Sequence, residues 1–536
     1  MNAASTPKHR HVPANLIAAL LCLVIISAVS LAWRFHERRP RVWSTSEVPV
    51  VFWSWRNTTP AQKDVENAIR GAHAQALFLR AGQIDAEAGK LSRVRAVKGK
   101  FPNSIEIHLV YDATRALLMA FENVDVNALA VLLSETYARD IARANVDLAR
   151  VAGIQLDMDV PTRLLERYEQ LLNALRARLP LGTKLSITGL ATWMDSSNLA
   201  SMLNAVDFWI PQCYGAVIPE KSSQLVPISS PEAVAETISR VRKLDHPFYA
   251  GLPAYGYAIL YSPRGNLIEV RGDLDPLRVA SDPNFELVER RPFRGISRLE
   301  TPTESEWRYM YRARGDGVTD GLVVHEGDTL MLDVPTAESL RGYSRSVREE
   351  AGDKLLGICV FRLPGDDDTT ALTIDQVKAA LADSSALIQT NVQLNSVNPA
   401  NNESSPGTSR MRVHAMNKGI AGGQLGDDAL TVSLRVPAGS VRGVAEIDGF
   451  FSLETLCDVE DAMGTNNPGA IRPCSLRRAN LLLLRARTWK PGASARANIS
   501  FDGQPPQSVS TIVTVLADDG RSWQQVQTIS IGRDDE

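Results

Sequence analysis

Residues 153–159 read Gly153-Ile154-Gln155-Leu156-Asp157-Met158-Asp159, a buried-strand pattern that ends in two carboxylates. Because alternate residues of a strand face the same side, Gln155, Asp157 and Asp159 share one face. At about 3.3 Å per residue, the backbones of the two aspartates lie roughly 6.6 Å apart. The segment therefore predicts a strand whose carboxyl end presents a pair of acidic groups.

This segment is one of eight short β-branched or aromatic runs that alternate with helical stretches. The runs are residues 48–55, 75–80, 105–111, 153–159, 184–190, 206–214, 248–253 and 355–363. Such alternation indicates βαβ units and a parallel sheet. Eight units close most naturally as a (β/α)8 TIM barrel, although a doubly wound sheet shares the pattern locally.

The last two runs are separated by about a hundred residues, far more than one crossover helix needs, which predicts an insertion before the last strand. Within it, residues 321–324 and 329–333 are predicted to pair as a hairpin across the turn 325–328. Farther along the chain, short alternating runs with Gly- and Pro-rich joints predict a C-terminal β-sandwich.

These patterns divide the chain into four parts. We expect a basic segment and membrane anchor over residues 1–42, an α/β barrel over 43–388, an Asn-, Ser- and Pro-rich linker over 389–412 and a β-sandwich over 413–536.

The N-terminal part contains an apolar run over residues 16–33. At about 1.5 Å per residue it can cross a hydrocarbon core of about 30 Å, which predicts a single transmembrane helix. A cleaved signal peptide is the alternative, because Ala28-Val29-Ser30 offers small residues. We expect the helix to bind the inner membrane, with the bulk of the chain in the periplasm.

Composition excludes nucleic acid as a partner, because 58 basic residues face 61 acidic ones and leave a formal net charge of −3. Cys457 and Cys474 flank a loop-like stretch and suit a disulfide in an exported protein, with two unpaired thiols as the alternative. None of the five cysteines has metal-ligand spacing, and we expect no metal or cofactor.

The acidic pair itself suits acid and base chemistry. Two close carboxylates push their pKa values apart, so that one stays protonated while the other stays charged. Glycosidic cleavage needs this division of roles. The alternative is that an aspartate caps the helix that begins near Pro161.

Several strand ends carry a resemblance to known families. Residues 153–159 resemble the fourth strand of glycoside hydrolase family 18 barrels, where D-x-D-x-E stands in place of Q-x-D-x-D. Residues 212–215, 251–256 and 357–361 resemble further strand ends of that family, in the same order. The run 52–55, the Asp-Met-Asp strand and residues 208–214 more closely resemble the bacterial family named domain of unknown function 3142.

The family 18 resemblance implies a substrate-assisted reaction on an N-acetylated sugar. It assigns Asp159 as acid/base, Asp157 as the carboxylate that orients the acetamido group, and Tyr214 as a group that steadies the sugar. Two positions depart from that family. Gln155 cannot ionise, and Gly215 lacks the carboxylate that the family has at that position.

Asp159 also departs from the family, since it is one methylene shorter than the glutamate it replaces. The alternative mechanism is an inverting pair, with Asp159 as acid and Asp112 as base across a water.

The other candidates would bind substrate. Tryptophans on the strand ends can stack on sugar faces, and Arg80 needs a polar partner if it points into the barrel. The predicted substrate-binding residues are Trp53, Trp55, Arg80, Asp112, Gln155, Trp193, Gln212, Tyr255 and Phe361. The acidic run 366–368 is interpreted as a solvated loop.

The sequence therefore favours a membrane-anchored envelope protein that hydrolyses a polysaccharide. A catalytically inactive, glycan-binding or scaffolding barrel is the alternative. A third hypothesis is an assembly partner whose sandwich binds protein.

Overall fold

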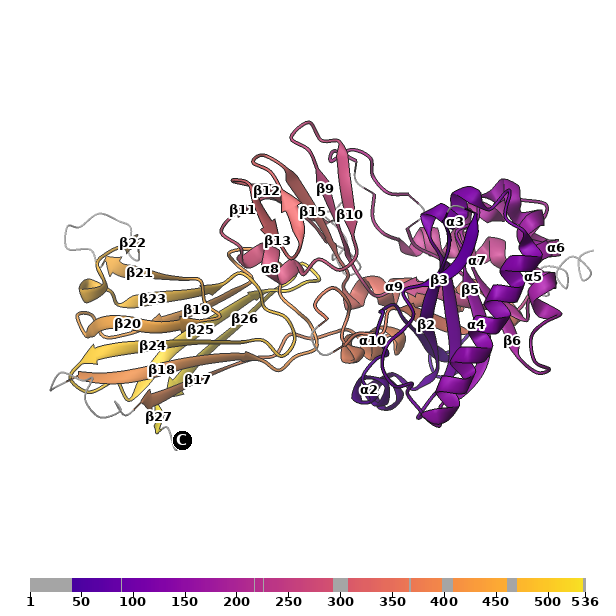
Figure 1. The fold of residues 1–536 in the computed structure, drawn as a ribbon. Helices are drawn as coiled ribbons and strands as arrows, with labels where there is room; N and C mark the ends of the chain where they lie inside the picture. The colour runs from indigo at the N-terminus through magenta and orange to yellow at the C-terminus, as the bar shows by residue number, and fades with distance from the viewer. Residues whose placement is uncertain are drawn as a thin grey trace, which may run out of the picture.

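The structure is a computed structural model with three units: a barrel, an insertion before the last strand of the barrel, and a C-terminal sandwich. Figure 1 shows the barrel on the right, the insertion in the middle and the sandwich on the left. The structure describes residues 41–87, 89–215, 217–224, 226–292, 307–365, 368–397, 408–459 and 470–533.

Eight parallel strands close into a barrel, because β1 pairs with β2 on one side and with β16 on the other. Each overlaps one of the eight predicted runs, so the barrel is confirmed. The strands are β1 (Val50–Ser54), β2 (Ala74–Glu87), β4 (Glu106–Ala113), β5 (Arg150–Asp157), β6 (Lys184–Gly189), β7 (Phe208–Pro211), β8 (Phe248–Pro253) and β16 (Leu355–Phe361). A short strand, β3 (Lys90–Val94), extends the sheet antiparallel to β2.

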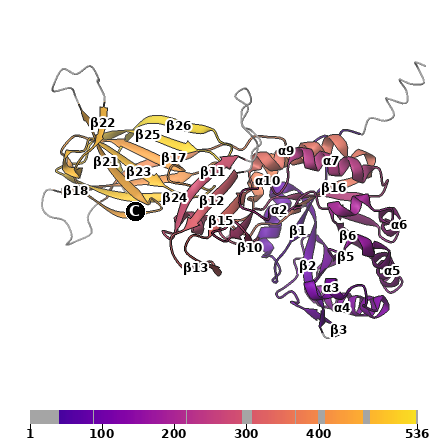
Figure 2. The same cartoon turned by 90° about the horizontal axis from the view of Figure 1, so that it is seen from above.

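Helices cover the outside of the barrel, as Figure 2 shows for α4, α5 and α6. On α5 the fully buried Leu171, Leu172 and Leu175 recur at helical spacing and join the barrel core. The helices are α2 (Gln62–Ala72), α3 (Arg115–Ala120), α4 (Val126–Val146), α5 (Leu165–Arg176), α6 (Leu199–Leu203), α7 (Pro231–Arg242), α9 (Ala337–Glu350) and α10 (Ile374–Leu381). Short 3-10 turns are η1 (Thr162–Leu164), η2 (Ala191–Asp195) and η3 (Gly352–Lys354).

The inside of the barrel is filled by side chains. Val51, Phe78, Val110 and Ile210 are buried there in one apolar cluster. The strands also approach closely at Gly153, where an added Cβ would lie 2.5 Å from the Lys184 carbonyl oxygen on β6. Because the interior is packed, a ligand has access to the barrel only at its ends.

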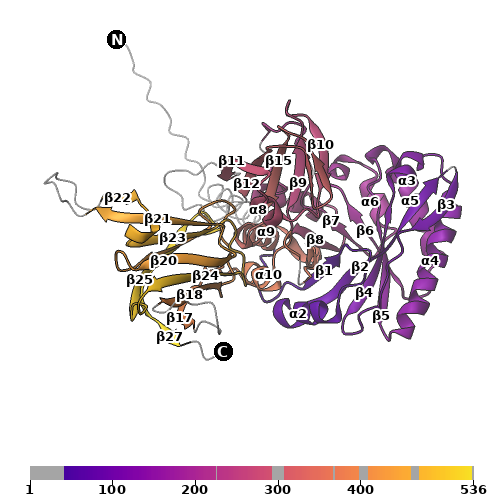
Figure 3. The same ribbon diagram turned by 60° about the vertical axis from the view of Figure 1, so that its left-hand side comes forward.

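The insertion is built on a five-stranded antiparallel sheet in the order β10-β9-β15-β12-β11. Figure 3 shows it between barrel and sandwich. Its elements are β9 (Tyr257–Tyr261), β10 (Leu267–Arg271), α8 (Pro276–Ser281), β11 (Phe285–Pro292), β12 (Trp307–Ala313), β13 (Gly317–Thr319), β14 (Leu322–Val324) and β15 (Thr329–Val334).

The predicted hairpin between residues 321–324 and 329–333 is wrong. β14 pairs with β13 instead, and β15 lies between β9 and β12. The physical reason is burial, because a central position in the larger sheet buries Leu330 and Leu332 in the core of the insertion.

The C-terminal unit is the predicted β-sandwich, with two sheets around a shared core. The sheet orders are β20-β24-β18-β17-β27 and β22-β21-β23-β19-β25-β26. The strands are β17 (Thr390–Val397), β18 (Thr408–Asn417), β19 (Leu430–Arg435), β20 (Val441–Asp448), β21 (Ser452–Val459), β22 (Ala470–Pro473), β23 (Leu481–Ala486), β24 (Ser494–Asp502), β25 (Ser508–Leu516), β26 (Ser522–Ser530) and β27 (Gly532–Arg533), with a 3-10 turn η4 (Leu476–Arg478).

The stretch expected to be a linker, residues 389–412, contains β17 and the first half of β18. These strands pair with each other along their full length, from Thr390 opposite Asn417 to Val397 opposite Arg410. β17 belongs to the sandwich because its alternate residues Val392 and Leu394 face the sandwich core.

The predicted transmembrane helix, residues 16–33, lies outside the described residues. Within the described part of the chain, no helix is both long and apolar enough to cross a membrane.

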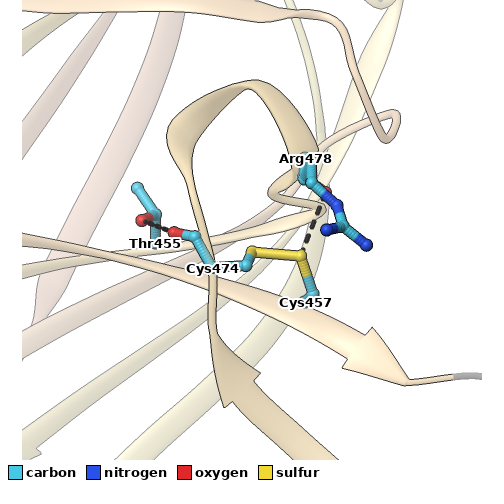
Figure 4. Close-up of a disulfide and its surroundings, with 4 residues drawn as sticks. All are labelled: Thr455, Cys457, Cys474 and Arg478. Atoms are coloured by element: carbon cyan, nitrogen blue, oxygen red, sulfur yellow. Dashed lines mark hydrogen bonds between the residues drawn. A yellow bond between two sulfur atoms is a disulfide. The ribbon is translucent and has the colours of Figure 1, made fainter.

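The predicted disulfide is confirmed. Cys457 on β21 is bonded to Cys474, which directly follows β22, with 5.9 Å between their Cα atoms (Figure 4). The Thr455 hydroxyl donates a hydrogen bond of 2.6 Å to the carbonyl of Cys474. The bond therefore holds the β21–β22 hairpin closed at one edge of the sandwich.

We expect replacement of both Cys457 and Cys474 by alanine to destabilise the sandwich by about 3 kcal/mol, because the bond constrains a loop of the unfolded chain. The two cysteines are 17 positions apart. Urea unfolding, followed by the fluorescence of the buried Trp489, measures the change. A thiol reductant should weaken the wild type and leave the double variant unchanged. Equal stability of both proteins would contradict a structural role for the bond.

Candidate functional site

The carboxyl ends of the barrel strands bring the predicted acidic residues together. Asp112 at the end of β4 lies opposite Asp157 at the end of β5 in the strand register. Asp159 follows two residues beyond Asp157, just outside the strand. Three carboxylates therefore share one side of the barrel mouth.

The acidic pair differs in exposure. Asp157 is partly buried, and its Oδ1 accepts a hydrogen bond of 2.5 Å from the Thr188 hydroxyl on β6. Burial raises the pKa of Asp157, and the negative charge of Asp159 raises it further. The Asp159 side chain is exposed, yet the surrounding protein and then the charge of Asp112 raise its pKa as well. Both shifts favour the protonated form.

Asp112 is held by a buried ion pair. Arg80 donates to both of its oxygens, from Nε and Nη2, at 2.9 Å each, and Gln83 donates a further bond of 2.8 Å. The Arg80 guanidinium also bonds Asn57 at 2.7 Å and lies 4.6 Å from the ring centroid of Trp55. Because both Asp112 oxygens are already bound by donors, the alternative assignment of Asp112 as the base is not supported.

Five aromatic rings form a cluster beside the acids. Phe361 is at its centre, with ring centroids 5.2 Å from Trp53, 6.1 Å from Trp55, 5.8 Å from Tyr214 and 4.8 Å from Tyr255. Burial is the largest cause that raises the pKa of the Tyr214 hydroxyl, and the charges of Tyr255 and Asp157 raise it further. The cluster therefore borders the acidic pair through Tyr214.

A cavity of about 670 Å³ opens above this cluster. Four predicted residues line it, namely Trp55, Arg80, Tyr255 and Phe361. Its opposite wall comes from the insertion and includes Gly272, Asp273, Asp275, Arg278 and Asp320. The barrel mouth is thus a walled recess in which the insertion faces the aromatic cluster.

The cavity also contains residues that the sequence analysis missed. Asp368 was interpreted as part of a solvated loop, but its side chain is only 3% exposed. It accepts two hydrogen bonds of 3.1 Å from Arg362 and one of 3.2 Å from Arg56. The sequence feature that could have predicted this role is the position of the two arginines. Arg362 follows Phe361 and Arg56 follows Trp55, at two neighbouring strand ends.

Two predicted site residues lie elsewhere. Trp193 is fully buried on the outside of the barrel, where its indole donates to the Val160 carbonyl at 2.9 Å and its ring packs on Tyr168. It is a core residue and cannot stack on a ligand here. Gln155 is fully buried and donates to the Ser186 hydroxyl at 3.3 Å. It packs inside the barrel below Asp157.

Gln212 is partly buried, and its backbone forms a bridge with Gly251 of β8. Within the ranges described above, no group of three or more His, Cys, Asp or Glu side chains could hold a metal ion.

The fold and the site together define a closed parallel barrel with an acidic pair and an aromatic cluster at its mouth. Residues 110–292 match the model of a family described as a domain of unknown function, DUF3142. This match confirms the resemblance to that family. No curated protein matches the chain.

The solved structures similar to this chain include a spore cortex-lytic enzyme and chitinases. The spore cortex-lytic enzyme SleL of Bacillus cereus is 14% identical, with 63% of this chain and 74% of that chain covered and a TM-score of 0.41. The C-terminal domain of a putative chitinase from Desulfitobacterium hafniense is 11% identical, with 62% of this chain and 98% of that chain covered and a TM-score of 0.42. A chitinase from Bacteroides thetaiotaomicron is 11% identical, with 63% of this chain and 97% of that chain covered and a TM-score of 0.37. At these scores the similarity carries no argument about substrate or reaction.

We expect Arg80→Met to destabilise the protein by about 3–5 kcal/mol, because it leaves the Asp112 carboxylate buried without its counter-charge. The double variant Arg80→Met/Asp112→Leu should recover much of that loss, since no unpaired charge remains. Urea unfolding of the wild type, both single variants and the double variant measures the coupling. Simple addition of the two single effects would contradict a tightly coupled pair.

Stability should depend on pH through Asp157. Because its pKa is raised to about 8, the folded protein binds this proton more tightly than the unfolded chain does. The stabilisation is present below about pH 4 and is lost as the pH rises toward the folded pKa. Asp157→Asn can still accept the Thr188 bond, and it should gain stability relative to the wild type between pH 4 and 8. A difference that stays constant across this range, measured by urea unfolding, would contradict the shift.

Proposed function

We propose that this protein hydrolyses glycosidic bonds of a polysaccharide at the barrel mouth, with Asp159 as acid/base and Asp157 as the assisting carboxylate. The observation that carries the proposal is the pair of adjacent carboxyl groups with raised pKa beside the aromatic cluster. A raised pKa favours the protonated form of a carboxyl group, and protonation of a leaving oxygen requires that form.

The exposures of the two aspartates suit these different roles. Asp159 is exposed and can reach the glycosidic oxygen of a bound sugar. Asp157 is fixed by Thr188 and can hold a substrate amide in one orientation. The acetamido oxygen then bonds to the anomeric carbon as the glycosidic bond breaks, and Asp159 gives its proton to the leaving oxygen. Water opens the intermediate and returns a proton to Asp159.

The aromatic cluster supports the choice of a sugar as substrate. Sugar rings have apolar faces, which pack on aromatic side chains, and hydroxyl groups, which bond to polar ones. The mouth offers both kinds of group, since Trp55 and Tyr255 lie in the same recess as Arg80 and Arg362. We propose that this recess binds the sugar units next to the cleaved bond.

Binding without hydrolysis is the second candidate. Position 155 is a glutamine that donates to Ser186, so the strand offers no third carboxylate below Asp157. Gly215 has no heavy atom within 4 Å of an added Cβ position among the described residues, so open space replaces the family's carboxylate beside Tyr214. Both observations favour a barrel that has kept its groove and lost its reaction.

We also propose an envelope location. The apolar residues 16–33 would anchor the chain in the inner membrane, and the rest would lie in the periplasm. The disulfide between Cys457 and Cys474 supports this location, because such bonds persist in oxidising compartments.

We expect Asp159→Asn to reduce glycan hydrolysis by about 10²–10⁴-fold while affinity is kept, because general-acid catalysis contributes about that much. Polymers of N-acetylhexosamine and of glucose serve as substrates, and the release of reducing ends is followed together with binding.

A matched control is Asp245→Asn, which removes the same charge at a side chain that is 82% exposed before β8, at the opposite end of the barrel. This variant should hydrolyse like the wild type. Binding by the wild type and by Asp159→Asn without release of reducing ends would establish the second candidate. Equal hydrolysis by Asp159→Asn and the wild type would refute the acid assignment.

A further inference from the structure

A second cavity, of about 610 Å³, lies where the barrel, the insertion and the sandwich meet. The barrel contributes Asn67 on α2, and the insertion contributes Trp307 and Tyr309 on β12. The sandwich contributes Leu425 and Lys490. No single unit could form this cavity alone.

The second cavity adjoins the cavity at the barrel mouth. Asp368, Thr369 and Thr370 line both of them. This shared wall is fixed, because Arg362 holds Asp368 and the Thr370 hydroxyl bonds to Asp368 at 2.7 Å. The two cavities therefore lie next to each other along residues 368–370.

The lining of the second cavity suits a ligand with both ring faces and hydroxyl groups. Trp307 and Leu425 contribute apolar surface to this lining, and the exposed Lys490 contributes a hydrogen-bond donor. On the sandwich side, the Asp518 carboxylate accepts a bond of 3.1 Å from the Gly422 backbone and offers further acceptor positions. Burial raises the pKa of Asp518 to about 7.

We propose that the second cavity binds a further stretch of the same polysaccharide, so that one chain of several sugar units runs from the barrel mouth past Asp368–Thr370 to the sandwich. The inference rests on the proposed function for its class of ligand. The edge of Trp307 that lines the cavity contacts an apolar sugar face, and the side chains of Lys490 and Asp518 bond to sugar hydroxyl groups. The protein thereby distinguishes polymers from short oligosaccharides.

The test uses binding rather than turnover. In the Asp159→Asn background, calorimetric titrations compare dimers and hexamers of N-acetylhexosamine and of glucose. The hexamer should bind at least about tenfold more tightly than the dimer, because only the hexamer reaches both cavities. Lys490→Ala removes an exposed side chain that lines the second cavity, and it should weaken hexamer binding about fivefold, the effect of one hydrogen bond. Dimer binding should stay unchanged.

Lys490→Ala leaves every core unchanged, because this side chain is exposed. Lys418→Ala, at an exposed side chain of the sandwich that lines neither cavity, is the matched control and should bind like the parent.

Equal affinity for dimer and hexamer would overturn the inference, and so would equal losses for both ligands in Lys490→Ala. A length dependence that persists although the wild type shows no hydrolysis would refute turnover and support the extended groove. Failure of every oligomer to bind would refute the proposed class of ligand, and the inference with it.

Discussion

Closure of the sheet through β1, which bonds to β2 on one side and to β16 on the other, places the polar groups that the barrel contributes to the candidate site. Because the barrel strands are parallel and their interior is packed, their carboxyl ends meet around one mouth. Trp55, Arg80 and Asp157 come from three such ends, far apart in the sequence. Each of them stands beside the others only because the ring of strands is complete.

Much of this arrangement follows from short local patterns in the sequence. The eight strands are visible as β-branched runs, because a strand buried on both faces needs continuous apolar residues. Asp157 and Asp159 could be placed at a mouth because they end such a run. The disulfide was predictable from a local pattern as well, since Cys457 and Cys474 flank one turn-like stretch.

What the sequence could not give depends on partners that are distant along the chain. Asp112 looks like a free carboxylate until the fold brings Arg80 against both of its oxygens. Trp193 follows a strand end as Trp55 does, but it packs outside the barrel rather than over its mouth. Similarly, β15 leaves its neighbour in sequence because a larger sheet buries more of its apolar surface.

The same dependence explains why the sandwich matters to the mouth of the barrel. Leu425, from the sandwich, is buried in the core of the insertion, and Arg290 of β11 bonds both oxygens of Asp428 at 2.7 and 3.1 Å. The insertion is therefore held by the sandwich as well as by the two barrel strands that it connects. The insertion forms the far wall of the recess, so the sandwich packs against the same unit that borders the candidate site. The position of that wall therefore rests on contacts from both ends of the molecule.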